Sequence, residues 1–182
     1  MKIISRAIAH RRQRGAALVV ALIMLLVMTV LGITAMQVTR MEERMAGNSR
    51  DVNLAFQAAE AGLRDAEGRI LAGPQPMTTC AAVPCAVWDL DHPLPADMRD
   101  RDLAWWNDHG AEYGVAGTQE MTDVTRDPVV SIEHMYFERD SYAKDPSGRK
   151  IGRDFYKITT RATGASGSAN VVLESTYTKR RD

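Results

Sequence analysis

The sequence predicts an α+β protein in which a long N-terminal helix packs on a C-terminal antiparallel sheet. Three observations predict this fold: an uncharged apolar run near the N-terminus, an apolar stripe with helical spacing directly after it, and three β-rich segments near the C-terminus. We expect a basic leader, a transmembrane helix, a continuation of that helix outside the membrane, an irregular loop region and the sheet. These five segments are residues 1–15, 16–39, 40–71, 72–125 and 126–182.

Composition narrows the function classes before any motif is considered. The 182 residues are 45% hydrophobic and 25% charged, which is ordinary for a folded chain. Lys and Arg number 23, as do Asp and Glu, so net charge gives no support for a nucleic-acid-binding surface. The basic residues are unevenly placed, because the first 15 residues hold five of them and no acid.

Residues 16–39 contain no charged side chain. Their apolar core, 16–36, would form a helix roughly 30 Å long, about the thickness of the hydrocarbon layer of a bilayer. The apolar region of a secretory signal is shorter, about 7–15 residues. We therefore expect a retained single-pass membrane helix rather than a cleaved signal or a buried core helix. Because the basic residues precede the run, the positive-inside rule keeps the N-terminus in the cytoplasm and exports the remainder of the chain.

An abrupt boundary, Arg14-Gly15-Ala16, separates the basic leader from the apolar run. This junction resembles the class III signal of type IV pilins, in which a prepilin peptidase cuts after the glycine and the new N-terminus is N-methylated. The resemblance implies cleavage after Gly15 and a methylated mature N-terminus at Ala16. A glycine suits the cleft of a protease because it lacks a Cβ and can lie extended. The alternative is a plain membrane anchor with an incidental glycine.

Val20 departs from the pilin pattern. Most pilins carry Glu at the fifth mature position, which is position 20 here, where it is thought to neutralise the N-terminal ammonium of the neighbouring subunit. A carboxylate inside an apolar bundle is costly unless it is paired. Subunits that resemble the tip-capping member of secretion pseudopili share the loss of this Glu, so Val20 favours a tip location. Plain sequence variation is the alternative explanation.

Two further motifs, MEERMAGN at 41–48 and LAFQAAEA at 54–61, are more specific than an apolar helix. They resemble the EEKMAGN and AFQAAEA signature of the PilX family of minor pilins. The segments YKITTRATG at 156–164 and VVLESTY at 171–177 resemble the closing strands of that family. The resemblance implies a type IV pilin-like fold.

The helix is expected to continue beyond the membrane, because apolar or small side chains recur at steps of three and four. This stripe comprises Val52, Phe56, Ala59, Leu63, Ala66 and Ile70. Packing on the chain's own sheet is the simpler interpretation. Recognition of a partner helix during assembly, with Phe56 and Leu63 as assembly residues, is the alternative.

The loop region carries five of the seven prolines and all three tryptophans, which predicts a long irregular connection with short helical or strand pieces. Its aromatic residues either pack it onto the sheet or mark a partner-binding surface. Cys80 and Cys85 are the two cysteines of the chain. In an exported domain this spacing predicts a small-loop disulfide, whereas a metal site would need more ligands than the nearby His92.

Three segments rich in β-forming residues predict an antiparallel meander of at least three strands, with one face on the helix. The strands are expected at 129–137, 155–163 and 171–177, with a turn at 164–167. In the middle segment Tyr156 and Ile158 alternate with Lys157 and Thr159, so the first pair is expected on one face of the sheet. The basic end, Lys179-Arg180-Arg181, is expected to be a solvated tail.

No convergent catalytic constellation stands out in the sequence. The histidines are scattered, and the segment GASGS at 164–168 misses the G-x-S-x-G nucleophile elbow at its last position. Neither an H-E-x-x-H motif nor a P-loop is present. Six aspartates between 89 and 108 lack the EF-hand spacing, so a solvated acidic loop is expected rather than a metal site. We expect no enzymatic activity, no cofactor and no metal.

The resemblance implies a minor pilin that primes polymerisation of the major pilin and sits at or near the pilus tip in a complex with other minor pilins. Twitching motility and adhesion would depend on it. The implied partners are the prepilin peptidase, the major pilin, other minor pilins, a large tip adhesin and the inner membrane, without nucleic acid. The alternatives are a minor pseudopilin of type II secretion and, from a different class, a membrane-anchored periplasmic enzyme.

Overall fold

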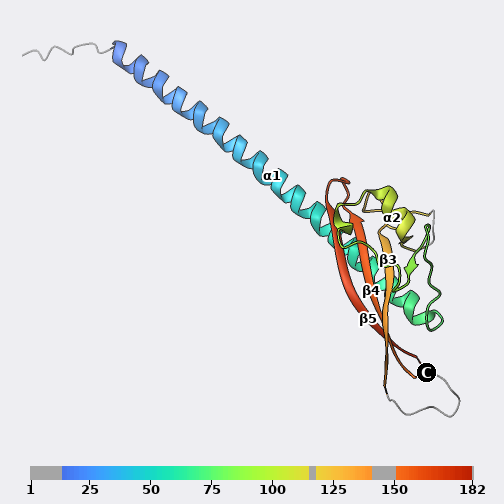
Figure 1. Ribbon diagram of the computed structural model, residues 1–182. Helices are drawn as coiled ribbons and strands as arrows, with labels where there is room; N and C mark the ends of the chain where they lie inside the picture. The colour runs from blue at the N-terminus through green and yellow to red at the C-terminus, as the bar shows by residue number, and fades with distance from the viewer. Residues whose placement is uncertain (1–13, 115–117, 141–150, 182) are drawn as a thin grey trace, which may run out of the picture. The chain divides into compact units, whose positions relative to one another are not determined.

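The computed structural model describes residues 14–114, 118–140 and 151–181 (Figure 1). The chain divides into two compact units, Met1–Ala46 and Gly47–Asp182. One helix, α1 (Arg14–Ala72), forms the described part of the first unit and continues into the second. The leader expected at 1–15 falls mostly outside the described residues.

The described part of the first unit is a helix whose threonine hydroxyls are hydrogen-bonded within the helix. Each threonine hydroxyl donates a hydrogen bond of 2.8–3.1 Å to a carbonyl three or four residues earlier in the helix. These residues are Thr29, Thr34 and Thr39. Internal hydrogen bonding of this kind is what a helix in hydrocarbon needs, since no water is present there. Among the described residues, α1 is the one helix long and apolar enough to cross a membrane.

The second unit is built on a five-stranded sheet in the order β1-β3-β4-β5, with β2 also paired to β3. The long strands β3, β4 and β5 form an antiparallel meander, which confirms the predicted one. The short β1 pairs in parallel with β3, so the sheet is mixed. The strands are β1 (Val87–Trp88), β2 (Ala111–Glu112), β3 (Val129–Arg139), β4 (Gly152–Thr163) and β5 (Asn170–Arg181).

One face of the sheet packs on α1 within the second unit. The main contact is a buried apolar cluster, and a second, alanine-rich cluster continues it towards the β4–β5 turn. The clusters are Ala66, Ile70, Val130, Ile132, Tyr156 and Ile158, and Ala58, Ala59, Val124 and Ala162. Burial of Tyr156 and Ile158 on the helix side confirms the predicted alternation in β4.

The predicted stripe of α1 is correct at Ala59, Ala66 and Ile70 and wrong at Val52 and Phe56. Val52 and Phe56 are 51% and 44% exposed, whereas Ala55 and Ala58 are buried in their place. The physical reason is size: small side chains let the helix backbone approach the sheet closely, so the helix turns its alanines and Gly62 inward. A methyl group on Gly62 would lie 2.9 Å from Cγ2 of Thr160 in β4.

The loop region forms a layer on the opposite face of the sheet, with η1 (Met98–Asp100) and α2 (Leu103–His109) as its short helices. Trp88 and Trp106 are buried there, which confirms that these aromatic side chains pack the region onto the sheet. The other members of the cluster are Cys85, Leu94, Met98 and Val129. Cys80 and Cys85 form a disulfide in this layer.

A buried carboxylate also holds the loop region to the sheet. Glu133 of β3 is 7% exposed and accepts a hydrogen bond of 2.7 Å from the backbone amide of Leu94. Its second carboxylate oxygen lies 2.9 Å from Nζ of Lys157 in β4. Paired in this way, the charge tolerates burial.

Candidate assembly surfaces

The expected junction between leader and helix falls in the first turn of α1. Gly15 and Ala16 are exposed, and a methyl group on Gly15 would meet no heavy atom within 4 Å. The first turn carries no acidic side chain to favour the positive end of the helix dipole. Glycine also lowers helix stability by about 1 kcal/mol relative to alanine. This turn can therefore unwind readily into the extended form that a protease binds.

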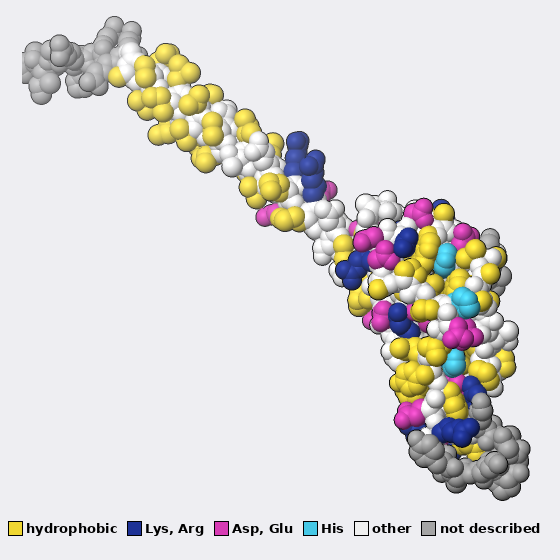
Figure 2. Space-filling view, in the orientation of Figure 1, with side chains coloured by type: hydrophobic (Ala, Val, Ile, Leu, Met, Phe, Trp, Pro, Cys, Tyr) yellow, Lys and Arg dark blue, Asp and Glu magenta, His cyan; other side chains and the backbone are white. Residues whose placement is uncertain are grey.

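The apolar part of α1 forms the first exposed surface. Hydrophobic side chains cover it in Figure 2, and a group of charged side chains follows. Its large hydrophobic residues between Leu18 and Met36 are 46–74% exposed, and Val20 among them is 55% exposed. Continuous apolar exposure of this kind requires lipid or other apolar helices as its surroundings.

Within the second unit, a group of hydrogen bonds connects α1 to the turn between β4 and β5. The Asp51 carboxylate accepts hydrogen bonds from the backbone amide of Ser166 at 2.9 Å and from the Ser166 hydroxyl at 2.5 Å. The backbone amide of Ala169 donates to the same carboxylate at 3.3 Å. The Ser166 hydroxyl and amide lower the pKa of Asp51, because they stabilise its charged form.

This contact depends on a glycine at the end of β4. A methyl group on Gly164 would overlap Oδ1 of Asp51 and would lie 2.6 Å from the backbone oxygen of the same residue. No side chain fits at those distances, so the turn approaches α1 as closely as backbone allows.

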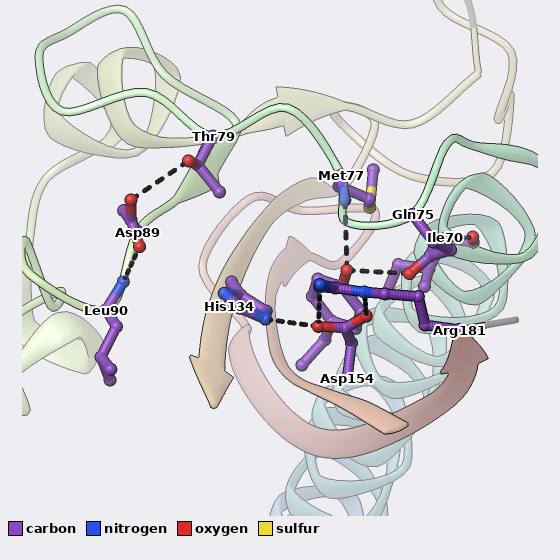
Figure 3. Close-up of polar contacts among 10 residues, drawn as sticks. Ile70, Gln75, Met77, Thr79, Asp89, Leu90, His134, Asp154 and Arg181 are labelled. Atoms are coloured by element: carbon purple, nitrogen blue, oxygen red, sulfur yellow. Dashed lines mark hydrogen bonds and ion pairs between the residues drawn. The ribbon is translucent and has the colours of Figure 1, made fainter. Parts of the chain in front are cut away.

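The far end of the sheet holds a buried ionic cluster (Figure 3). Asp154 of β4 is fully buried and accepts a hydrogen bond of 2.7 Å from Nε of Arg181, whose Nη2 bonds the other carboxylate oxygen. Nε2 of His134 lies 2.9 Å from Oδ1 of the same carboxylate. The expected solvated tail is therefore wrong for Arg181, because β5 carries it to a buried carboxylate that needs a counter-charge.

A tyrosine beside this cluster connects the sheet to the chain that leaves α1. The Tyr156 hydroxyl donates to the side-chain oxygen of Gln75 at 3.0 Å and accepts from the backbone amide of Met77 at 3.2 Å. Burial raises the pKa of Tyr156, so the phenol stays neutral and keeps its donor.

Lys179 is the second basic residue that the structure removes from the expected tail. Its ammonium donates to three backbone carbonyls at and just beyond the C-terminal end of α1, at 2.6–3.1 Å. These carbonyls belong to Ile70, Leu71 and Gly73. A cation there satisfies orphan acceptors and complements the negative end of the helix dipole. β5 is thus fastened to α1 at the end opposite Asp51.

The described residues show no catalytic or metal-binding arrangement. His134 and Asp154 are paired, but in the described part of the chain no serine, cysteine or threonine is bonded to that histidine. No group of three His, Cys, Asp or Glu side chains there could hold a metal ion. In the aspartate-rich segment Asp97 pairs with Arg101, and Asp102 caps α2 by accepting from the Trp105 amide.

No sequence motif marks Asp51, Asp154 or Lys179 as residues with buried or bonded side chains, although two of them leave a signal. Asp154 and Lys179 have the same parity in their strands as the helix-facing Tyr156 and Tyr177. A charged residue in the buried phase of a strand predicts a partner. Asp51 leaves no such signal, because its partner is 115 residues away in sequence.

Apolar helix, sheet-packed continuation and antiparallel meander together define a membrane-anchored subunit with a type IV pilin-like fold. Two family models match this chain: PilX N-terminal over residues 14–64, and the C-terminal model of the type IV pilus assembly protein PilX over residues 56–179. The chain belongs to the PilX family of type IV pilus assembly proteins. No curated protein and no solved structure shows significant similarity to it.

Proposed function

We propose that this chain is a minor pilin that primes type IV pilus assembly and occupies a position at or near the pilus tip. The observation that carries the proposal is the exposed apolar helix with Val20 where most pilins have Glu. Twitching motility and adhesion would follow from the filaments that it primes. The PilX match favours the pilus over a secretion pseudopilus.

Processing would convert the membrane protein into a subunit ready for assembly. The prepilin peptidase would cut after Gly15 on the cytoplasmic side, and Ala16 would become the N-methylated mature N-terminus. The basic leader holds the N-terminus in the cytoplasm and the sheet in the periplasm, by the positive-inside rule. The subunit would then move from lipid into a bundle of similar helices.

Val20 supports the tip position through the cost of burying charge. A buried ammonium without a partner costs several kcal/mol. In a pilin that carries the usual Glu, the carboxylate would neutralise the N-terminus of a neighbouring subunit. A subunit with Val20 offers no carboxylate, so it fits best where no further pilin docks above it.

The partners of this subunit would be other minor pilins, the major pilin and a large tip adhesin. Phe56 is 44% exposed on the second unit, so it can contact a neighbour. Leu63 packs at the margin of the main buried cluster and is half-buried. We propose both as assembly residues.

The processing step is tested by co-expressing the chain with a prepilin peptidase. The wild type should shorten by the 15 residues that precede Ala16. Gly15→Leu should stay uncut, because the side chain obstructs the cleft, and Gly32→Ala should be processed normally. Processing of Gly15→Leu at the wild-type rate would contradict the assigned junction.

The priming role is tested by deleting the gene and counting surface pili. We expect a large loss of pili that the wild-type gene restores. We expect Val20→Glu to restore them less well and to spread the subunit along the shaft in immunogold images. An unchanged pilus number in the deletion strain would exclude priming.

A further inference from the structure

The strand β5 is an open edge of the sheet. It pairs with β4 along its whole length, and no described strand lies on its other side. Exposed edges are normally protected by charged residues, prolines or bulges. Over residues 170–178, β5 carries a single charged side chain, Glu174, and no proline. An unprotected edge of this length is suited to pairing with another strand.

The helix α1 packs on one face of the sheet and runs in the same direction as β5. Asp51 contacts the turn just before β5, and Lys179 near the end of β5 contacts the carbonyls of Ile70 and Leu71. The twenty residues of α1 between these two contacts rise about 30 Å, and the ten residues of β5 rise about 33 Å. The two stretches therefore have nearly the same length.

One flank of α1 can be assigned to the β5 side. Arg69 donates to the backbone oxygen of Glu112 in β2, which places its flank towards β2 and β3. Successive residues are rotated by about 100° around the helix axis. Measured from Ala66, Phe56 and Leu63 therefore lie about 80° and 60° away on the side opposite Arg69. Because the helix covers the middle of the sheet, that other flank faces β5.

This assignment explains why the stripe in the sequence is broader than the buried face. Val52, Phe56 and Leu63 extend it towards the open edge, where two of them are exposed and one is half-buried. The helix-side residues of β5 beside them, Val171, Leu173 and Tyr177, are also only partly buried. An apolar row therefore runs beside backbone that no described strand pairs with.

The outer margin of this row is acidic. Glu60 and Glu67 lie about 120° and 100° from Ala66 on the same flank. Both are half-buried, and neither has an ion pair with a described residue. Basic side chains on a segment paired to β5 would complement these two carboxylates.

We infer that β5 accepts an extended segment from a different subunit of the pilus, which adds a strand to the sheet. Its helix-facing side chains are apolar beside Phe56 and Leu63 and basic beside Glu60 and Glu67. The outer backbone groups of β5, which no described strand pairs with, select an extended occupant rather than a helix, since a helix satisfies its own backbone groups. The inference rests on the proposed function for the identity of the partner.

The test places the photoreactive residue p-benzoylphenylalanine in the full chain, in piliated cells, at Glu174, Thr176 or Thr178. All three are exposed. Illumination should yield one adduct with another pilus subunit, mapped by mass spectrometry. Strand pairing predicts that each two-residue step along β5 moves the attachment point by two residues on the partner. Leu90, 55% exposed beyond β1 at the other edge of the sheet, is the control position.

Blocking variants complete the test. Neighbouring amides in a strand point to opposite edges, so either Ser175→Pro or Thr176→Pro blocks the open edge while leaving the β4–β5 hydrogen bonds intact. The variant that keeps the wild-type melting temperature should reduce the Thr178 adduct at least tenfold. Phe56→Glu should reduce it similarly, and Phe56→Leu should not.

The inference is overturned if Thr178 gives no adduct in assembled subunits, if the adduct is a second copy of this chain, or if attachment points step by three or four as on a helix. It is also overturned if both blocking variants leave the adduct intact. Pilus counts in the deletion strain judge the priming role separately. A two-residue step in a strain whose pilus number does not depend on the chain would support the inference and remove that role.

Discussion

Asp154 is a carboxylate inside the protein, where its charge needs a partner. Its carboxylate is fully buried, its charge is balanced by Arg181 on β5, and Nε2 of His134 on β3 lies within hydrogen-bond distance of it. A buried ion pair of this kind adds little to the stability of the fold, compared with apolar residues at both positions. The loss of one partner is costly, because the remaining charge stays buried.

We therefore predict that Arg181→Ala destabilises the second unit by about 3 kcal/mol. For a domain of this size that lowers the melting temperature by about 12 °C, as circular dichroism would measure. The control is Arg153→Ala, whose side chain is 58% exposed beside Asp140. Exposed pairs contribute about 0–1 kcal/mol, so this variant should melt close to the wild type. Equal melting of both variants would contradict the role given to Arg181.

The lowered pKa of Asp51 predicts that the stability of the second unit depends on pH in the acid range. Its pKa is lowered in the folded chain, mainly by the Ser166 hydroxyl and amide. A carboxyl with a depressed folded pKa contributes stability that is present above the unfolded pKa, about 4, and is lost as the pH falls through the folded value. The difference in melting temperature between wild type and Asp51→Asn should therefore be largest at pH 5–7 and shrink below pH 4. A constant difference down to pH 2 would contradict this assignment.

At the scale of elements, the close packing of α1 on the sheet rests on its smallest residues. A methyl group on Gly62 would lie 2.9 Å from Cγ2 of Thr160 and 3.2 Å from side-chain atoms of Pro128 and Val130. Gly68, on the same helix, has no heavy atom within 4 Å of such a methyl group. The same substitution should therefore have opposite effects at these two positions.

We predict that Gly62→Ala destabilises the second unit by about 1–3 kcal/mol through overpacking. Gly68→Ala should stabilise it by about 0.5–1 kcal/mol, since alanine is the better helix former. Urea unfolding monitored by tryptophan fluorescence measures both. If Gly62→Ala were as stable as Gly68→Ala, the helix would not lie as close to β4 as the structure places it.

The elements differ in how well the sequence predicts them. The helix and the three long strands follow from local patterns, namely an uncharged apolar run and the alternation around Tyr156 and Ile158. The parallel pairing of Val87 with Ile132 in β3 has no local pattern, because a two-residue strand leaves too few alternating positions. Val52 and Phe56 were wrongly predicted to be buried for another reason. Large apolar residues usually predict burial, but the short distance between α1 and the sheet leaves room only for alanines and glycine.

At the scale of the whole molecule, the two units need different surroundings. The three buried clusters all belong to the second unit. The apolar window of α1 is 0% buried, so the first unit depends on lipid or on neighbouring helices. Motifs in the sequence predict Gly15, Ala16 and Val20 as junction residues, and these assignments stay predictions. The surface that joins β5 to α1 could not be predicted, because it is assembled from segments about 110 residues apart.

This division predicts that residues 47–182 fold without the first unit. Because its clusters and ionic contacts lie within that stretch, the truncated chain should melt within about 3 °C of the full chain in detergent, by the small cost of new exposure. Far-ultraviolet circular dichroism measures the melting, and sedimentation after cell lysis measures the partition. The full chain should sediment with membranes, whereas residues 47–182 should stay in the supernatant. An unfolded truncation would show that the apolar helix also serves the fold of the second unit, and a membrane-bound one would show that the second unit itself binds membranes.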